Sequence, residues 1–150
     1  MNKVYQMWDL AIKSHAGQVD KAGQPYIYHI DAVWNNLRDL VDDADDELIQ
    51  IAIGHDLIED TTVTSLELRV LGFSDRVVDG IVALTKLKSE SYEDYKARVL
   101  SSKDASLVKL ADLKHNMDLT RLPTLTQKDL DRVAKYHQFY KQIQLTFGLA

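Results

Sequence analysis

An apolar stretch that ends in four ionisable residues constrains this chain more than any other feature. The stretch spans residues 47–53 and contains few residues that break a helix; it is followed by Gly54-His55-Asp56-Leu57-Ile58-Glu59-Asp60-Thr61. A helix that is apolar nearly all round is usually buried. Burying a charge is costly unless the charge is paired or binds a metal. The ionisable residues at the end of this helix therefore call for a chemical explanation.

The spacing of these four residues favours a metal site. On a continuous helix, residues four positions apart share a face, which predicts His55 beside Glu59 and Asp56 beside Asp60. A neutral imidazole with carboxylates suits a divalent cation such as Mn, Fe or Zn. A His-Asp dipeptide alone arises often by chance and would indicate only solvated acids at a helix end. The longer His-Asp-x-x-Glu-Asp pattern favours a metal site, with further ligands elsewhere in the chain.

Length and charge narrow the class of protein. A chain of 150 residues suits one domain, spanning residues 1–150, that can bury a sizeable core. Its net charge of −5 argues against broad binding to nucleic acid or to an anionic membrane. No cysteine is present, which excludes disulfides and thiolate metal sites and fits a reducing compartment. Without a bilayer-spanning apolar run or a signal-peptide pattern, a cytoplasmic protein is expected.

Apolar periodicity predicts helices throughout and a single all-α domain. The i, i+3, i+4 spacing predicts a first helix over residues 2–15 and another over residues 104–117. Pro25 is expected to start the second helix, and Ser74 and Ser91 to cap later ones. A last helix is expected from Thr126 to about Phe147, with Gly148 as its C-cap signal. No alternation typical of a strand persists anywhere in the sequence.

Two further ionisable residues stand inside apolar helical stretches. His29 lies among the apolar residues of the second helix, and Asp112 lies among those of the helix over residues 104–117. Taken alone, His29 would be a hydrogen-bonded core histidine. Together with His55 and Asp56, these residues supply two imidazoles and two carboxylates, which would leave positions on a metal for water. Glu59 and Asp60 then exceed what one metal needs and suit a general-base or water-orienting role.

Three motifs in the same order carry a family resemblance. They are G-Q-x-x-K-x-G-x-P-Y-I-x-H at residues 17–29, H-D-x-x-E-D at 55–60 and K-L-A-D-x-x-H-N-M at 109–117. This arrangement resembles the HD-domain hydrolases of the RelA/SpoT family, in particular the small stand-alone alarmone hydrolases of the metazoan SpoT homologue type. The order and spacing hold over roughly residues 3–147.

The resemblance implies an HD-domain helical bundle and a specific reaction. The reaction is removal of pyrophosphate from the 3′ position of guanosine tetra- or pentaphosphate, the alarmones of the stringent response. It implies Mn²⁺, or another divalent metal, held by His29, His55, Asp56 and Asp112, with Glu59 and Asp60 as the catalytic acidic pair. It also implies nucleotide contacts at Lys21, Tyr95, Arg98 and Asn116.

Three positions depart from the family pattern and leave other functions open. Asp20 and Asp118 stand where the family often has Arg, and Leu113 stands where it usually has Arg or Lys. Each lost phosphate contact would remove a charge-assisted hydrogen bond, worth roughly 1.5–3 kcal/mol. One alternative is an HD phosphatase for another small phosphorylated nucleotide, such as NADPH.

A second alternative is a nucleotide-binding module without turnover. Retention of all six metal and acidic residues argues against such a module. The expected partner is a small-molecule nucleotide, without nucleic acid or membrane, and the sequence leaves self-association open.

Overall fold

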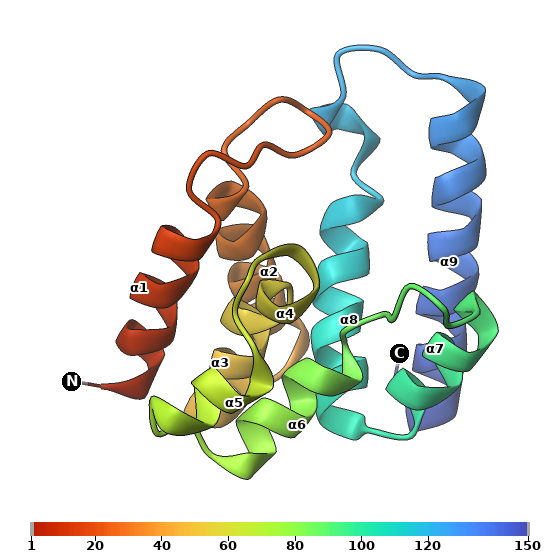
Figure 1. Cartoon of the computed structure of the whole chain (residues 1–150). Coiled ribbons are helices and arrows are strands. Elements are labelled where there is room, and N and C mark those ends of the chain that lie inside the picture. Colours follow the sequence, from red (N-terminus) through yellow and green to blue (C-terminus); the bar gives the residue numbers. More distant parts are fainter. Residues whose placement is uncertain (1, 150) are drawn as a thin grey trace.

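A computed structural model describes residues 2–149 as a set of packed helices (Figure 1). In chain order they are α1 (Lys3–Ser14), α2 (Ile27–Leu40), α3 (Asp46–Gly54), α4 (Leu57–Asp60), α5 (Ser65–Val70), α6 (Asp75–Ala83), α7 (Tyr92–Leu100), α8 (Lys103–Asn116), η1 (Leu119–Arg121, a 3₁₀ turn) and α9 (Gln127–Phe147). Within residues 2–149, strand-type pairing is limited to one isolated bridge between Val19 and Pro25. The prediction of an all-α fold is confirmed.

Side-chain caps fix where several helices begin. Ser74, Ser91 and Thr126 each accept a hydrogen bond from a backbone N–H in the first turn, as their sequence positions predicted. Thr126 and Asp129 bond reciprocally in a capping box, which sets the start of α9. Gly148 ends α9 with a φ of 64°, a left-handed conformation that favours glycine.

The prediction that Pro25 starts the second helix is wrong by two residues. The helix begins at Ile27, because residues 25 and 26 are still tied to the preceding loop. Pro25 pairs with Val19 in the isolated bridge, and the Tyr26 N–H donates to the Gln18 carbonyl oxygen at 2.9 Å. The loop over residues 15–26 therefore folds back on itself before α2 starts.

The prediction of one continuous helix through the His-Asp-x-x-Glu-Asp motif is also wrong. α3 ends at Gly54, His55 and Asp56 form a turn, and α4 begins at Leu57. The His55 ring hydrogen-bonds through Nδ1 to the Ala52 carbonyl oxygen at 2.7 Å. That oxygen is the one that the Asp56 N–H would bond if the helix continued. The motif is therefore divided between a turn, which holds His55 and Asp56, and α4, which holds Glu59 and Asp60.

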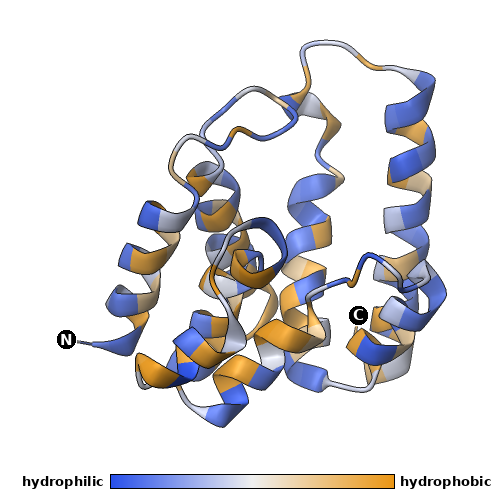
Figure 2. Ribbon diagram, in the orientation of Figure 1, coloured by the Kyte–Doolittle hydropathy of each residue, from blue (hydrophilic) through white to orange (hydrophobic). Residues whose placement is uncertain are grey.

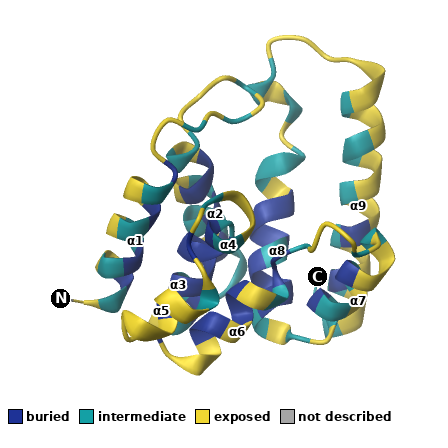
Figure 3. Ribbon diagram, viewed as in Figure 1, coloured by how far each residue is buried: buried dark blue, intermediate teal, exposed yellow. Residues whose placement is uncertain are grey.

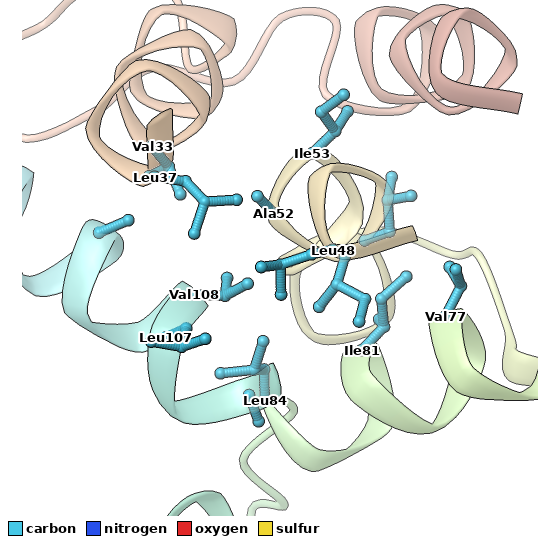
Figure 4. Packing of buried hydrophobic residues seen from close by; sticks show 14 of the residues in the cluster. Val33, Leu37, Leu48, Ala52, Ile53, Val77, Ile81, Leu84, Leu107 and Val108 are labelled. Carbon is cyan, nitrogen blue, oxygen red and sulfur yellow. The ribbon is translucent and has the colours of Figure 1, made fainter. Parts of the chain in front are cut away.

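Helix α3 lies at the centre of the core. It packs against α1, α2, α6 and α8, and α2 packs against α8 in turn. Its Leu48 and Ala52 lie among apolar side chains of α2, α6 and α8 (Figure 4). Apolar faces turn inward around α3 and α8 (Figure 2), and these two helices carry much of the buried surface (Figure 3). The end of α3 is thereby held rigidly, and with it the His55-Asp56 turn.

The remaining helices enclose one side of α8. α9 packs along α8, and α7 packs against both α8 and α9. Phe139 and Ile143 of α9 are fully buried at this contact. None of the helices within residues 2–149 combines the length and apolarity needed to cross a membrane.

Candidate metal centre and active site

The four residues predicted to bind a metal lie together. His29 of α2, His55 and Asp56 of the α3–α4 turn, and Asp112 of α8 each offer one ligand atom, and these atoms lie within 4.8 Å of one another. His29 Nε2 is 2.9 Å from Asp112 Oδ1 and 3.8 Å from Asp56 Oδ2. Segments far apart in the sequence therefore converge on one small volume, because α2 and α8 both pack against α3.

His55 is oriented as a metal ligand. Its hydrogen bond to the Ala52 carbonyl oxygen requires a proton on Nδ1, so Nε2 is the ring nitrogen that can offer a lone pair to a metal. Nε2 is buried and makes no hydrogen bond of acceptable geometry, although Asp56 Oδ2 and Asp112 Oδ1 lie 2.9 and 3.3 Å away. A buried nitrogen without a directed partner, beside two carboxylate oxygens, fits a cation bound between them.

The electrostatics of the cluster also favour a cation. Burial lowers the pKa of His55, but the negative charges of Asp56 and Asp112 outweigh it and raise that pKa well above its usual value. Burial raises the pKa of Asp112, yet the Lys109 ammonium and the neighbouring histidines hold it well below the ordinary range. Burial raises the pKa of Asp56, but the neighbouring His55 lowers it to about 2, so both carboxylates are ionised and attract positive charge. The residues present fit a divalent metal with nitrogen and oxygen ligands.

Several neighbours fix the ligands in place. Tyr26 donates its hydroxyl to Asp56 Oδ2 at 2.5 Å, and Asn116 donates to Asp112 Oδ1 at 3.1 Å. His115 Nδ1 lies 2.7 Å from His29 Nδ1. Burial and the nearby His29 lower the pKa of His115 to about 4, so its ring is neutral at pH 7. Partners of this kind orient metal ligands and raise their affinity.

Glu59 and Asp60 lie beside the metal cluster and outside it. Burial by the surrounding walls and the charge of Asp56 raise the pKa of Asp60 to about 6. The pKa of Glu59 is also raised by burial, and its Oε1 accepts a 2.7 Å hydrogen bond from the Lys86 backbone N–H. A carboxylate whose pKa lies near neutrality can exchange a proton at physiological pH.

The metal cluster opens into a polar cleft of about 380 Å³. Six acidic and four basic side chains line the cleft. They come from the loop before α2, the α3–α4 turn, α4, α8, the segment after α8, and α9. The acids are Asp20, Asp56, Glu59, Asp60, Asp112 and Asp118, and the cations are Lys21, Lys109, Arg121 and Arg132. A divalent cation would offset the excess of negative charge.

The predicted nucleotide contacts divide into two groups. Lys21 and Asn116 line the cleft. Tyr95 and Arg98 are not among the residues that line it. Tyr95 is buried and its hydroxyl donates to the Leu84 carbonyl oxygen at 3.2 Å, whereas Arg98 pairs with Glu90 and donates to the Thr85 carbonyl oxygen. Both residues hold the loop over residues 84–91, which carries the Lys86 N–H to Glu59.

Some lining residues were missed by reasoning from the sequence. Arg121, Arg132 and Tyr136 line the cleft from the segment after α8 and from α9. Arg132 and Tyr136 are four positions apart on a helix, a spacing that could have flagged a shared face. Arg121 carries no such signal, because it lies in a short 3₁₀ turn whose direction only the tertiary structure sets. Leu113, one of the departures from the family pattern, is fully buried in the core.

Comparison with known proteins gives matches in sequence and in structure. No protein-family model matches the chain. It is 35% identical over 136 residues to a guanosine-3′,5′-bis(diphosphate) 3′-pyrophosphohydrolase of Haemophilus influenzae. That match covers 84% of this chain and 20% of the Haemophilus protein. It is 32% identical over 128 residues to the bifunctional (p)ppGpp synthase/hydrolase SpoT of Escherichia coli, with 78% and 18% covered.

The chain is a homologue of the RelA/SpoT proteins. This RelA/SpoT homologue spans about a fifth or less of the length of the relatives described above. A solved structure of a metazoan SpoT orthologue, described as hydrolysing ppGpp, superposes with a TM-score of 0.74 at 23% identity. The match covers 100% of this chain and 98% of the other, so the two share the HD-domain helical fold over their whole length.

Proposed function

We propose that residues 1–150 form one metal-dependent phosphohydrolase domain. Its reaction is removal of pyrophosphate from the 3′ position of guanosine tetra- or pentaphosphate. One observation carries the proposal: four ligand atoms lie within 4.8 Å of one another at a cleft that also holds Glu59 and Asp60. The similarity to guanosine-3′,5′-bis(diphosphate) 3′-pyrophosphohydrolases supports this choice of substrate.

The residues of the cleft divide the chemical work. His29, His55, Asp56 and Asp112 would hold the metal, for which we propose Mn²⁺, a metal that suits imidazole with carboxylate ligands. When bound, the metal would supply Lewis acidity and lower the pKa of water. In the hydrolysis, water bonds to the phosphorus attached to the 3′ oxygen, and the bond between that phosphorus and the 3′ oxygen breaks. Asp60, with a pKa of about 6, takes up the proton of the attacking water, which Glu59 orients, and a proton passes to the 3′ oxygen that leaves.

Substrate binding is assigned to the cationic and amide groups of the cleft wall. Lys21 and Asn116 line the cleft and are the direct nucleotide contacts that we propose. Tyr95 and Arg98 act on the site through the loop over residues 84–91, which they hold against Glu59. A chain without cysteine fits a reducing compartment, so we propose the cytoplasm as the place of action.

The acids of the cleft favour one second candidate. Asp20 and Asp118 add negative charge to the lining. A polyphosphate is repelled by such a wall more than a substrate with fewer charges. A phosphatase for another phosphorylated nucleotide, such as NADPH, is therefore the alternative function.

One experiment separates the two candidates. Protein loaded with Mn²⁺ is incubated with guanosine tetraphosphate, and pyrophosphate release is followed; a parallel reaction with NADPH follows phosphate release. Asp56→Ala, which removes a metal ligand, is the control for both. We expect pyrophosphate release that disappears in the control. Phosphate release from NADPH alone, by protein that binds metal, would replace the proposed reaction with the alternative.

A further inference from the structure

The most informative contact outside the metal cluster joins Asp20 to Arg121. Arg121 Nη2 lies 2.7 Å from Asp20 Oδ2, and the two side chains are only 20% and 8% exposed. The residues are 101 positions apart, one in the loop before α2 and the other in η1, and Figure 1 shows these two segments approaching each other. Both side chains line the cleft. This ion pair is therefore part of the cleft wall.

Asp20 is a rigid anchor for the guanidinium. Its Oδ1 accepts hydrogen bonds from the Ala22 and Gln24 backbone N–H groups at 2.9 and 3.0 Å. Burial raises its pKa, but these bonds and Arg121 outweigh the effect and keep the pKa below its ordinary value. The carboxylate is ionised at neutral pH, and only its second oxygen is left to hold Arg121.

The loop that carries Asp20 is fastened to the active site. Gln18 donates to the Asp60 carbonyl oxygen at 2.8 Å, and Tyr26 bonds Asp56. On the other side, Arg121 Nη1 donates to the His115 carbonyl oxygen at 3.0 Å, and the His115 ring contacts His29. The guanidinium is thus held from both sides at a fixed position relative to the metal ligands.

Arg121 keeps binding capacity after these contacts. A guanidinium has five N–H donors in a planar fork. Arg121 uses one on Asp20 and one on the His115 carbonyl, and no further partner occurs among residues 2–149. A fixed guanidinium with donors to spare, on the wall of a cleft, is suited to bidentate binding of a phosphate group.

We propose that Arg121 binds the diphosphate group of the substrate, and that Asp20 is a positioning residue that holds it there. The inference deepens the proposed function and rests on it. Under this proposal the acidic residue at position 20 has a role. Its negative charge is offset by Arg121, and it holds the Arg121 guanidinium in the cleft wall. Two other cations of the cleft pair within their own helices, Lys109 with the metal ligand Asp112 and Arg132 with Asp129, whereas Arg121 joins two segments far apart in the sequence.

Calorimetric titration of the Mn²⁺-loaded protein with inorganic pyrophosphate measures the binding affinity and tests this assignment. We expect Arg121→Gln to weaken binding about tenfold or more, the loss of a charge-assisted hydrogen bond. The double variant Asp20→Asn/Arg121→Gln removes both charges and keeps the side-chain shapes similar. It should also bind about tenfold more weakly than the wild type. If it binds as tightly as the wild type, Arg121 only neutralises Asp20 and the proposal is overturned.

Asp20→Asn alone tests the positioning role. Removal of a negative charge should by Coulomb's law tighten anion binding, whereas loss of the anchor should weaken it. We expect weaker binding; tighter binding would overturn the role of Asp20. Arg69→Gln, which alters a surface arginine paired with Asp75 and Asp79, is the matched control and should leave binding unchanged. Thermal melting of each variant establishes that it is folded.

The two proposals fail in different ways. A wild-type protein that binds pyrophosphate but releases none from guanosine tetraphosphate contradicts the proposed function only. A wild-type protein that does not bind pyrophosphate contradicts the role of Arg121, whatever its turnover.

Discussion

The Tyr26 hydroxyl donates a 2.5 Å hydrogen bond to Oδ2 of Asp56, the carboxylate that follows His55 in the turn after α3. Tyr26 lies at the end of the loop before α2, so this bond links that loop to the metal cluster. Burial and the charge of Asp56 raise the pKa of Tyr26 far above its usual value, so the hydroxyl keeps its proton and donates at neutral pH. The bond fixes the direction in which Asp56 offers its other lone pairs.

Tyr26→Phe should weaken metal binding. The change removes one hydroxyl, and loss of a partner that orients a metal ligand costs about 10- to 100-fold in affinity. Calorimetric titration of metal-free protein with Mn²⁺ measures the effect. Tyr28→Phe removes the same group from an exposed side chain two residues away and should leave the affinity unchanged. Equal affinities in both variants would show that Asp56 needs no help from Tyr26.

Asp60 should set the acidic limit of activity. It must be ionised to take up a proton, and its pKa is raised to about 6 by burial and by Asp56. Bound metal favours the ionised form and shifts this limit downward. The dependence of kcat/KM on pH should therefore fall on the acid side at or below about pH 6. Asp60→Asn should lose turnover at every pH while still binding Mn²⁺.

The same raised pKa predicts an effect on stability in the metal-free protein. The folded-state pKa of Asp60 lies above its unfolded-state value. At pH values between these two pKa values the folded state binds more protons than the unfolded state, so the free energy of unfolding decreases as pH rises to about 6. Asp60→Asn should therefore raise the melting temperature above that pH and change it little in acid. Hydrogen bonds to Thr120 lower the pKa of Asp118, so its ionised form stabilises the folded state. Asp118→Asn should therefore lower the melting temperature at neutral pH.

The sequence predicted the helices more accurately than the turns between them. Apolar periodicity placed α1 and α8 within one residue of their observed ends, because each buries one face against the core. It failed at the His55-Asp56 turn, where a side-chain hydrogen bond to the Ala52 carbonyl oxygen competes with the helix. Local propensity contains no information on that competition, because the His55 ring is buried beside His29 of α2 and Asp112 of α8, which are distant in the sequence.

The site shows the same division. The metal-binding residues were recognisable because ionisable side chains in apolar stretches are costly and need a partner. The cleft wall was not recognisable, because the Asp20–Arg121 pair joins residues 101 positions apart through the packing of a loop on η1. At position 113 the sequence was misleading in the other direction. Leu113 looked like a lost phosphate contact, but its side chain is fully buried in the core.

Lys109→Met should destabilise the metal-free protein more than the metal-loaded one. Lys109 Nζ lies 3.0 Å from Asp112 Oδ2, and both side chains are largely buried. Breaking such a pair leaves an uncompensated charge and costs about 3 kcal/mol in the free energy of unfolding. A bound metal compensates Asp112 from the other side, so Mn²⁺ should reduce the loss. Denaturant unfolding with and without Mn²⁺ measures both values.

Lys114→Met is the control for this change. Lys114 is exposed on the same helix, so its removal should alter the free energy of unfolding by less than about 0.5 kcal/mol. An equal loss for Lys109→Met with and without metal would mean that the metal does not share the charge of Asp112.

Gly80→Ala should destabilise the protein, although alanine favours helices over glycine by about 0.5–1 kcal/mol. A Cβ at Gly80 would lie 2.5 Å from Ile51 Cδ1 and 2.9 Å from Ile51 Cγ1, where α6 crosses the buried α3. Overpacking of this kind costs about 1–3 kcal/mol, which exceeds the gain in propensity. Ile51→Val removes the nearer methyl group, so the double variant should lose less stability than the two single changes added together. Denaturant unfolding of the four proteins completes the cycle; strict additivity would mean that α6 moves away from α3 instead of pressing on Ile51.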